Sequence, residues 1–571
     1  MSLICWRPLS EPALTRQRQV VRWAPLAFAG VILIWHALQY GFVTDDAFIS
    51  FVFSRNFAEH GELVFNPGLP PVEGYTNFLW TFLLGLLAFI GIPLEPASIA
   101  LGIGFGLGGL WMSFRITERI LGRGHPLAAV PALLLACSAG YACWSSGGLE
   151  TQLYTFLVAA ALDAYLAADD EPRAFRRVGI FLALASMTRP EGPLLVALVG
   201  AHRLGRNLLV ERRWKPTQDE LLAAAWFLGL WAPWFLWRWW YYGWPFPNTY
   251  YVKATDPVPT CAAGMAQEQC DAIRAAAAKA TAAYDARMKH HGWHYVGRWF
   301  QQTALVWVSP LALLGLVGPP RSVRLAFGTL AAIVTGVYLY YVVGVGGDFM
   351  GLHRFIMPLF VLAAIAVTLG ADHLARLVTR FIPAVGSFAR VYLAGALVAG
   401  FFSHQYALTT KSLTFGNFKN DDGIDTPAYL RVYAHDRALI GKRLRACVRP
   451  DDFAIYGGVG AMPWHARLRG IDVFGLVSSR IAHEVPRGRD RAGHNKWGPD
   501  PLLADHHPTI VMHCYALRGV PGVAPLGCAG YWEGLGFERV VLHVPGMLEQ
   551  GQYYTFLVKK DRNMQCPGLE R

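Results

Sequence analysis

Charged residues are scarce in this chain. Asp, Glu, Lys and Arg make up 16% of its 571 residues, and hydrophobic residues make up 54%, whereas soluble domains usually carry about a quarter charged residues. The few charges lie between apolar blocks that are long enough to cross a bilayer. This shortage excludes an ordinary soluble enzyme and predicts a polytopic α-helical membrane protein.

Several motifs of known chemistry are also missing. None of the nine cysteines stands in a CxxC or Cys/His spacing that would hold zinc. The run from Asp452 to Ala461 is glycine-rich but lacks the GxGxxG spacing and the lysine of phosphate loops, so we interpret it as a strand, a turn and a helix start. The net charge of +12 does not indicate nucleic acid, because the arginines lie in short loops between apolar blocks.

Apolar blocks of spanning or near-spanning length fill the first 405 residues, and they predict about 9–11 membrane helices. They cover residues 21–40, 76–92, 97–114, 127–143, 149–168, 178–201, 220–240, 302–318, 325–345, 354–371 and 389–405. Basic loops favour the cytoplasmic side, which places the N-terminus inside. The same rule places outside the segments 41–75, 241–301 and 346–353 and the C-terminal region.

Two blocks do not fit this alternation. The block 76–92 is short, and we expect a re-entrant or interfacial helix there. The block 178–201 has basic residues that belong on one side at both ends, and it is broken around Arg189-Pro190-Glu191. Irregular backbone and charge at membrane depth are tolerated only against protein or a wet cavity. The break therefore indicates a functional site.

The sequence predicts two domains: a transmembrane domain over 1–405 and an extracytoplasmic α/β domain over 406–571. Short β-rich runs in the second part are typical of strands; they lie at Phe453–Tyr456, Thr509–Met512, Arg539–Val544 and Tyr553–Val558. Six cysteines fall in regions placed outside, where disulfides form. We expect a Cys261–Cys270 disulfide first, and a Cys514–Cys528 disulfide is compatible with the same location.

Adjacent carboxylates follow the first span. Asp45 and Asp46 could hold a proton or a cation near a reacting hydroxyl. The simpler interpretation is a helix N-terminus that Thr44 or Asp45 caps. One aspartate as a cap and the other as a catalytic group are compatible.

A second polar cluster lies in a tight hairpin between two spans. It contains Asp348, His353 and Arg354, more polar groups than a turn requires. Arginine binds phosphate through two parallel hydrogen bonds and stabilises a phosphate leaving group. A surface ion pair is the alternative, and we favour a site.

Four further polar clusters interrupt the apolar blocks. The first resembles a substrate-shaping turn before a helix, and the other three have structural alternatives: a helix N-terminus for the second, an ion pair for the third and a snorkelling lysine for the fourth. The clusters contain, in this order, Glu73 and Tyr75; Glu150; Arg189 and Glu191; and Asn248, Tyr250 and Lys253.

Taken together, these motifs resemble the GT-C glycosyltransferases. The order and spacing are similar to the branch of the mycobacterial terminal β-(1→2) arabinofuranosyltransferase and its bacterial relatives, which include flagellar motor control proteins. The similar segments are Asp45-Asp46-Ala47-Phe48-Ile49-Ser50, Asn66-Pro67-Gly68, Val72-Glu73-Gly74-Tyr75-Thr76-Asn77, Gly148-Leu149-Glu150-Thr151, Thr188-Arg189-Pro190-Glu191-Gly192, Pro247-Asn248-Thr249-Tyr250-Tyr251-Val252-Lys253 and Gly346-Gly347-Asp348-Phe349-Met350.

The resemblance implies an inverting transfer of a sugar from a polyprenyl-phosphate donor to an extracytoplasmic glycan or glycolipid, in a bacterial inner membrane. It makes Asp45 or Asp46 the general base. It assigns the donor phosphate to Arg354, with His353, Lys253 and Arg189 in support. Substrate contacts then fall to Glu73, Tyr75, Glu150, Glu191, Asn248, Tyr250 and Asp348.

The resemblance does not determine the sugar, and arabinofuranose and a hexose both stay open. No cofactor is required, although a divalent cation beside Asp45 and Asp46 is compatible with the motif. Two other functions stay open: a transporter, which also uses broken helices and intramembrane charge, and a non-catalytic assembly or motility factor.

Overall fold

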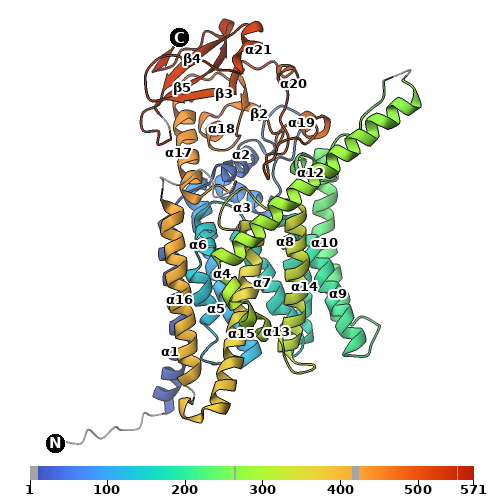
Figure 1. Cartoon of the computed structure of the whole chain (residues 1–571), viewed down its shortest axis with the longest axis vertical. Coiled ribbons are helices and arrows are strands. Elements are labelled where there is room, and N and C mark those ends of the chain that lie inside the picture. Colours follow the sequence, from blue (N-terminus) through green and yellow to red (C-terminus); the bar gives the residue numbers. More distant parts are fainter. Residues whose placement is uncertain (1–10, 263–264, 387, 415–422, 550) are drawn as a thin grey trace, which may run out of the picture.

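The protein is a helical bundle with a β-sheet domain at one end (Figure 1). The computed structural model describes residues 11–262, 265–386, 388–414, 423–549 and 551–571, with side chains from Arg22 onward. The first helix begins at the opposite end of the bundle from the sheet (Figure 1). We call the end that carries the sheet the domain end.

Most of the described helices up to Leu413 run along the bundle (Figure 1). They are α1 (Glu11–Tyr40), α4 (Leu94–Leu121), α5 (Val130–Cys137), α6 (Ala139–Ser146), α7 (Thr151–Ala167), α8 (Phe175–Thr188), α9 (Gly192–Leu209), α10 (Gln218–Tyr242), α13 (Leu305–Leu316), α14 (Val323–Gly344), α15 (Met357–Phe381) and α16 (Phe388–Leu413).

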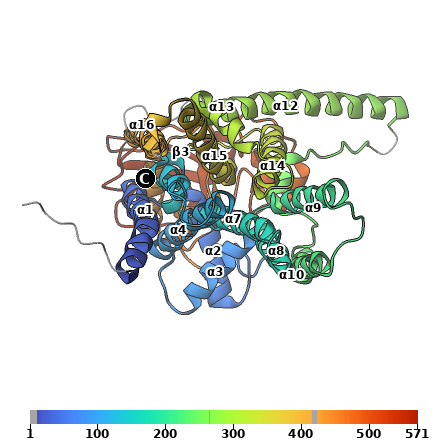
Figure 2. The same ribbon diagram turned by 90° about the horizontal axis from the view of Figure 1, so that it is seen from below.

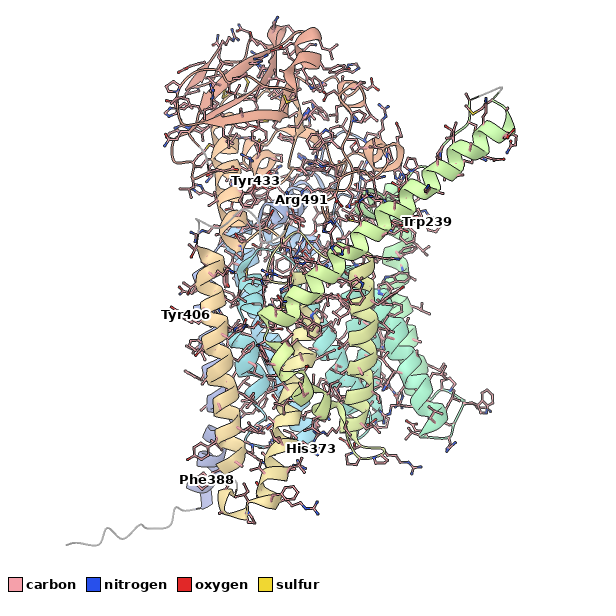
Figure 3. The ribbon with its side chains drawn as sticks, viewed as in Figure 1. Trp239, His373, Phe388, Tyr406, Tyr433 and Arg491 are labelled. Atoms are coloured by element: carbon pink, nitrogen blue, oxygen red, sulfur yellow. A yellow bond between two sulfur atoms is a disulfide. The ribbon has the colours of Figure 1, made fainter. Side chains whose placement is uncertain are left out.

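In the described part of the chain, six helices are long and apolar enough to cross a membrane. They are α1, α4, α10, α14, α15 with the turn before it, and α16. Apolar and aromatic side chains cover the outer surface of the bundle; Trp239, Phe388 and Tyr406 are exposed examples (Figure 3). The chain is therefore a multi-pass membrane protein.

The block 76–92 forms α3 (Phe78–Phe89), whose 12 residues are too few to cross a bilayer. It packs against α2 (Asp45–His60), and both helices lie near the domain end (Figure 1). This placement agrees with the interfacial helix that the sequence predicts.

The block 178–201 is two helices, α8 and α9, which contact each other and are joined at Arg189-Pro190-Glu191. The turn is tight, because a Cβ at Gly192 would lie 2.3 Å from the Cα of Ser186. A helical hairpin explains why basic residues flank both ends of this block on the same side.

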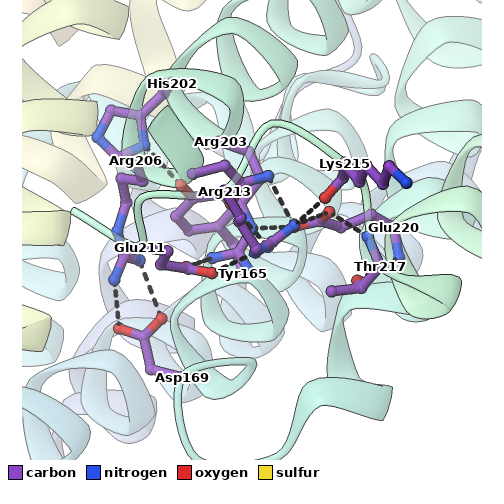
Figure 4. Close-up of polar contacts among 11 residues, drawn as sticks. Tyr165, Asp169, His202, Arg203, Arg206, Glu211, Arg213, Lys215, Thr217 and Glu220 are labelled. Carbon is purple, nitrogen blue, oxygen red and sulfur yellow. Dashed lines mark hydrogen bonds and ion pairs between the residues drawn. The ribbon is translucent and has the colours of Figure 1, made fainter. Parts of the chain in front are cut away.

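Ion pairs join the ends of α7, α8, α9 and α10, and Figure 4 shows those of α7, α9 and α10. Glu220 of α10 accepts hydrogen bonds from Arg203 of α9 and from Arg213, and Arg206 pairs with Asp169 at the end of α7. Arg176 of α8 pairs with Asp219. These contacts hold the open end of the α8–α9 hairpin against α7 and α10.

The helix α12 (Gln267–Gln302) crosses one side of the bundle obliquely and extends beyond it (Figures 1 and 2). The last bundle helix, α16, continues to Leu413, past the domain boundary expected at 405. Its polar residues are bonded to α1: Thr409 bonds His36 at 2.8 Å, and both Thr409 and Ser412 bond Tyr40. Because these hydroxyls have partners, the helix extends past its apolar stretch.

The C-terminal domain has one mixed sheet in the order β2-β1-β3-β5-β4-β6. Strand β1 pairs in parallel with β2 and β3, and the other pairings are antiparallel. The strands are β1 (Phe453–Tyr456), β2 (Arg469–Asp472), β3 (Ile510–Arg518), β4 (Phe537–His543), β5 (Tyr553–Lys559) and β6 (Leu569–Glu570); the helices are α17 (Pro427–Leu444), α18 (Ala461–Ala466), α19 (Ser479–Glu484), α20 (Asp500–Ala504) and α21 (Ala529–Gly534). The four predicted runs correspond to β1, β3, β4 and β5, whereas β2 and β6 have no strong sequence signal.

Three disulfides occur in the described part of the chain. The structure pairs Cys261 with Cys270 and Cys514 with Cys528, as the sequence suggests. The third joins Cys447 to Cys566 across 119 residues of sequence. Spacing alone does not indicate this pair, because sheet formation brings the two cysteines together.

We expect the Cys447–Cys566 disulfide to stabilise the C-terminal domain most. Closing a loop of about 100 residues contributes about 4–5 kcal/mol in the chain-entropy model, against about 3 kcal/mol for a loop of about 15 residues. Replacing both cysteines by serine should therefore lower the melting temperature more than the same change at Cys514 and Cys528. A smaller loss at Cys447 and Cys566, in thermal unfolding of the purified chain, would contradict this expectation.

Candidate active site

Four regions that the sequence places on one side meet at the domain end. The nitrogen of Ala461 donates to Asp45, and the side chain of Asn248 donates to the carbonyl of Gly475 at 2.6 Å. The nitrogen of Gly351 donates to the carbonyl of Asp425. These bonds tie each of the segments 41–75, 241–301 and 346–353 to the C-terminal domain.

The aspartate pair opens α2. Thr44 precedes the helix with extended backbone and makes no capping hydrogen bond with its side chain. The simple cap interpretation of Thr44 is therefore wrong, because its hydroxyl points to the sulfur of Met350 at 3.9 Å instead. Both carboxylates stay available for other contacts.

Asp46 faces the hairpin between α14 and α15. Its Oδ2 lies 3.7 Å from Nη2 of Arg354, and its side chain is 35% exposed. Arg354 is 8% exposed and donates through Nε to Oδ2 of Asp348 at 2.5 Å. Its guanidinium also lies 5.5 Å from the ring centre of Trp144. Arg354 thus stands between two carboxylates and an aromatic face.

Lys253, in α11 (Asn248–Ala254), brings a second cation to this cluster. Its side chain reaches solvent, yet the surrounding protein removes much of its water and lowers its pKa, and Arg354 adds to that shift. Burial raises the pKa of Asp46, while Arg354 and Lys253 act against the shift. An accessible carboxylate and two cations therefore share one local field.

Asp45 points toward the C-terminal domain. Its Oδ1 accepts from the nitrogen of Ala461 at 2.8 Å. Burial raises the pKa of Asp45 to about 6; the charge of Asp46 adds to the shift, and the Ala461 N–H and Arg437 oppose it. A carboxylate with this pKa can accept a proton near neutral pH.

The glycine-rich run 452–461 makes the approach of Asp45 feasible. A Cβ at Gly460 would lie 2.0 Å from the carbonyl oxygen of Asp45, and one at Gly458 would lie 2.9 Å from the hydroxyl of Tyr433. Tyr433 itself lies where α17 meets the bundle (Figure 3). The run is a strand, a turn and a helix start, as the sequence predicts, and its glycines let the turn contact α2.

A second ion cluster lies at the break between α8 and α9. Arg189 pairs with Glu150 at 2.8 Å and with Glu191 at 3.1 Å, and all three side chains are buried. Asn77 donates to the other oxygen of Glu150 at 2.9 Å. The ring of Phe355 lies against both Arg189 and Arg354, with guanidinium-to-centroid distances of 4.9 and 5.3 Å. Phe355 thereby joins the two clusters.

Several predicted site residues lie outside this group. Glu73 is buried in an ion pair with Arg238 of α10, and the hydroxyl of Tyr75 bonds that of Tyr242 at 3.0 Å. The side chain of Asn248 donates hydrogen bonds to carbonyls of the C-terminal domain. Tyr250 is exposed, with its ring 4.6 Å from that of Phe246. These residues hold the loops that surround the site.

His353 also points elsewhere. Its Nε2 bonds Oε1 of Gln302 at 2.8 Å. Burial lowers the pKa of His353 to about 3, and Arg298 adds to the shift. The imidazole is therefore neutral at pH 7 and brings no positive charge for a phosphate.

Sequence reasoning missed three contributors: Asn77, Trp144 and the Tyr433–Arg437 pair. The guanidinium of Arg437 lies 4.5 Å from the ring centre of Tyr433, which is close to Asp45. Asn77 stands inside a motif that the sequence singled out, so its position was a usable signal. Trp144 looks like an ordinary aromatic residue of an apolar block, and Tyr433 looks like one of a polar helix, so neither gives a signal.

No group of three His, Cys, Asp or Glu side chains in the described part of the chain is arranged to hold a metal ion. Asp46 and Asp348 both contact Arg354. Lys253 adds a second positive charge to the local field at Asp46.

The fold is known from solved structures. A crystal structure of ArnT from Cupriavidus metallidurans bound to undecaprenyl phosphate is 12% identical and matches 94% of this chain and 98% of its own, with a TM-score of 0.56. The apo structure of the same protein is 13% identical, matches 94% and 97%, and has a TM-score of 0.52. An oligosaccharyltransferase from Archaeoglobus fulgidus in complex with Zn and sulfate is 11% identical. The match covers 78% of this chain and 62% of its own, with a TM-score of 0.47.

No protein-family profile and no curated protein match the sequence. The structural likeness shows that this chain has the fold of the GT-C glycosyltransferases, the group that its motifs resemble. The chain shares the ArnT-like arrangement, a multi-helix membrane domain followed by a C-terminal mixed-sheet domain.

Proposed function

We propose that this protein is an inverting glycosyltransferase. It moves a sugar from a polyprenyl-phosphate donor to a glycan or glycolipid acceptor outside the cytoplasm. The contact between Asp46 and Arg354, 308 positions apart in sequence, carries the proposal, because it puts the aspartate pair beside a cation that can hold a phosphate.

The two aspartates divide the work. Asp45 is the general base, because its pKa of about 6 suits proton acceptance. Its carboxylate bonds the nitrogen of Ala461 and forms no ion pair with Arg354, unlike that of Asp46. In an inverting displacement the base and the leaving group stand on opposite sides of the anomeric carbon. Asp46 pairs with Arg354 and orients it.

The transfer is a single displacement. The acceptor oxygen attacks the anomeric carbon and gives its proton to Asp45, while the bond from that carbon to the phosphate oxygen breaks. Polyprenyl phosphate leaves with the electron pair, and Arg354 and Lys253 stabilise its negative charge. Arg189, Glu191, Glu150 and Asp348 orient the sugar and the arginines. No metal ion is needed, since two cations already face the phosphate.

The position at the domain end supports a lipid-linked donor. The tail stays in the membrane while the phosphate reaches the site, and ArnT, with this fold, has been crystallised with undecaprenyl phosphate. The ends away from the sheet carry basic residues such as Arg177, Arg203 and Arg376. We therefore place those ends in the cytoplasm and the site outside. Arabinofuranose is the first donor sugar to test, because of the branch that the motifs resemble.

Turnover assays test the proposal. Purified protein in detergent should transfer radiolabel from a polyprenyl-phosphate sugar to an acceptor oligosaccharide and release polyprenyl phosphate in equal amount. A panel with pentose and hexose donors covers the open choice of sugar. No transfer from any lipid donor, with the fold intact by thermal unfolding, would favour a transporter or a non-catalytic assembly factor.

A further inference from the structure

A strongly basic cleft lies between α2 and the C-terminal domain, separate from the aspartate site. Its volume is about 520 Å³. It is lined by one end of α2, by the segment after α17 and by the turn between α18 and β2. The lining includes five arginines, Arg55, Arg445, Arg449, Arg467 and Arg469, and one carboxylate, Glu59.

The positive charge in this cleft exceeds what the protein neutralises. Glu59 pairs with Arg467 at 2.8 Å. In the described part of the chain no carboxylate forms an ion pair with the other four arginines; three of them donate to carbonyl oxygens, those of Trp464, Ala466 and Pro450. Carbonyl groups satisfy hydrogen bonds without neutralising charge.

Arg55 shows the strength of the local field. It is part-buried beneath Trp464, with its guanidinium 4.8 Å from the ring centre. Burial lowers the pKa of Arg55 to about 10. The charges of Arg467 and Arg445 lower it further, and Glu59 acts in the opposite direction. Like charges gathered without compensation destabilise a fold, so their presence together points to an anionic ligand.

The cleft and the aspartate site share two helices. Asp45 and Arg55 are ten positions apart in α2, which is about 15 Å along the helix axis. On α18, the nitrogen of Ala461 bonds Asp45 and the carbonyl of Trp464 bonds Arg55. The cleft is thus a distinct site on the same rigid pair of helices.

We propose that this cleft binds a phosphate-bearing ligand with more than one negative charge. Guanidinium groups match phosphate oxygens in planar, paired hydrogen bonds, and several arginines around one space favour a multiply charged group. The cleft lies at the junction of the membrane bundle and the soluble domain. Two sources fit that place: the headgroup of an acidic lipid or glycolipid, and a water-soluble phosphorylated compound.

Binding of inorganic pyrophosphate to the full chain in neutral detergent tests the proposal. The variant R445Q/R449Q/R469Q should bind at least about tenfold more weakly than wild type, since it removes three charged donors to the phosphate oxygens. The variant R480Q/R518Q/R539Q removes the same charge elsewhere in the domain and should bind within about twofold of wild type. Equal affinity in the first variant, or equal loss in both, would overturn the proposal.

Two further arms separate this site from the donor site and from folding effects. The charge-neutral variant R354Q/D348N should keep the pyrophosphate affinity of the cleft, whatever happens to transfer activity; loss of binding there would assign the signal to the donor site and overturn the proposal. If the triple variant does not fold, R445Q/R449Q, in which both side chains are exposed, carries the test.

Nanodiscs distinguish the two sources. If a lipid headgroup is the ligand, cardiolipin in the disc, which carries two phosphates, should weaken pyrophosphate binding to wild type, compared with phosphatidylcholine alone, and leave the triple variant unchanged. If the ligand is water-soluble, pyrophosphate should bind equally in both discs. In both cases pyrophosphate binding depends on Arg445, Arg449 and Arg469.

Discussion

Replacing Asp45 by asparagine is expected to lower kcat about 1,000-fold, within the range of a general base. Asparagine keeps an oxygen that can accept from the nitrogen of Ala461, so the contact between α2 and the C-terminal domain remains. It cannot accept the proton of the acceptor hydroxyl. Steady-state transfer from a polyprenyl-phosphate sugar measures the effect, and KM for the donor should change little.

The pH profile should report the same carboxylate. Asp45 acts deprotonated, and its pKa is about 6, so kcat/KM should rise about tenfold per pH unit below 6 and level off above it. Asp46→Asn is the matched control: it removes a neighbouring negative charge that raises the pKa of Asp45. In that variant the rise should move to lower pH.

Two results would contradict the assignment of Asp45. One is activity in Asp45→Asn above a tenth of the wild-type rate. The other is an unchanged rise near pH 6 in that variant, which would make another group the titrating base. A loss in Asp46→Asn larger than in Asp45→Asn would reverse the division between the two aspartates.

Removing the charge of Arg354 is expected to weaken binding of polyprenyl phosphate at least about 100-fold. Two charge-assisted hydrogen bonds to phosphate contribute about 1.5–3 kcal/mol each, and 1.4 kcal/mol corresponds to a factor of ten. The single change Arg354→Gln also leaves buried Asp348 without its partner, at a cost of about 3–5 kcal/mol in stability. The double variant R354Q/D348N avoids that unpaired charge and isolates the loss of binding.

The chain offers a matched control for this pair. Glu73 and Arg238 form another buried arginine–carboxylate pair outside the aspartate cluster. The variant E73Q/R238Q should bind polyprenyl phosphate within about twofold of wild type, although it removes the same two charges. Native mass spectrometry or displacement of a labelled lipid phosphate measures both affinities. Similar losses in the two double variants would mean that Arg354 acts through stability and not through the phosphate.

Much of the site was predictable because its signals are local. Charged residues inside or directly beside an apolar block are visible in sequence, and so Asp45, Asp46, Arg189, Glu191, Asp348 and Arg354 all stand out. The break between α8 and α9 is similar, since Pro190 and two charges interrupt an otherwise apolar run. The positions of the basic loops also placed on one side of the membrane the four regions that meet at the domain end.

Other assignments depended on packing that no local pattern encodes. Glu73 and His353 belong to the same motifs as the site residues, yet one pairs with Arg238 and the other bonds Gln302. Asp45 and Asp46 are adjacent, but the helix turn between them sends one toward Ala461 and the other toward Arg354. Cys447 and Cys566 meet only because the sheet has formed.

By itself, the sequence determined that the protein crosses a membrane several times and ends in a strand-containing domain. It also showed polar clusters that a purely structural membrane bundle does not need. Hydropathy, charge and strand patterns are short-range properties, so they survive without coordinates. Only the tertiary structure decided which carboxylate faces which arginine and that five arginines from three segments line one cleft. Those facts depend on the packing of α2 against α18 and of the helices around α14 and α15, which joins residues far apart in the chain.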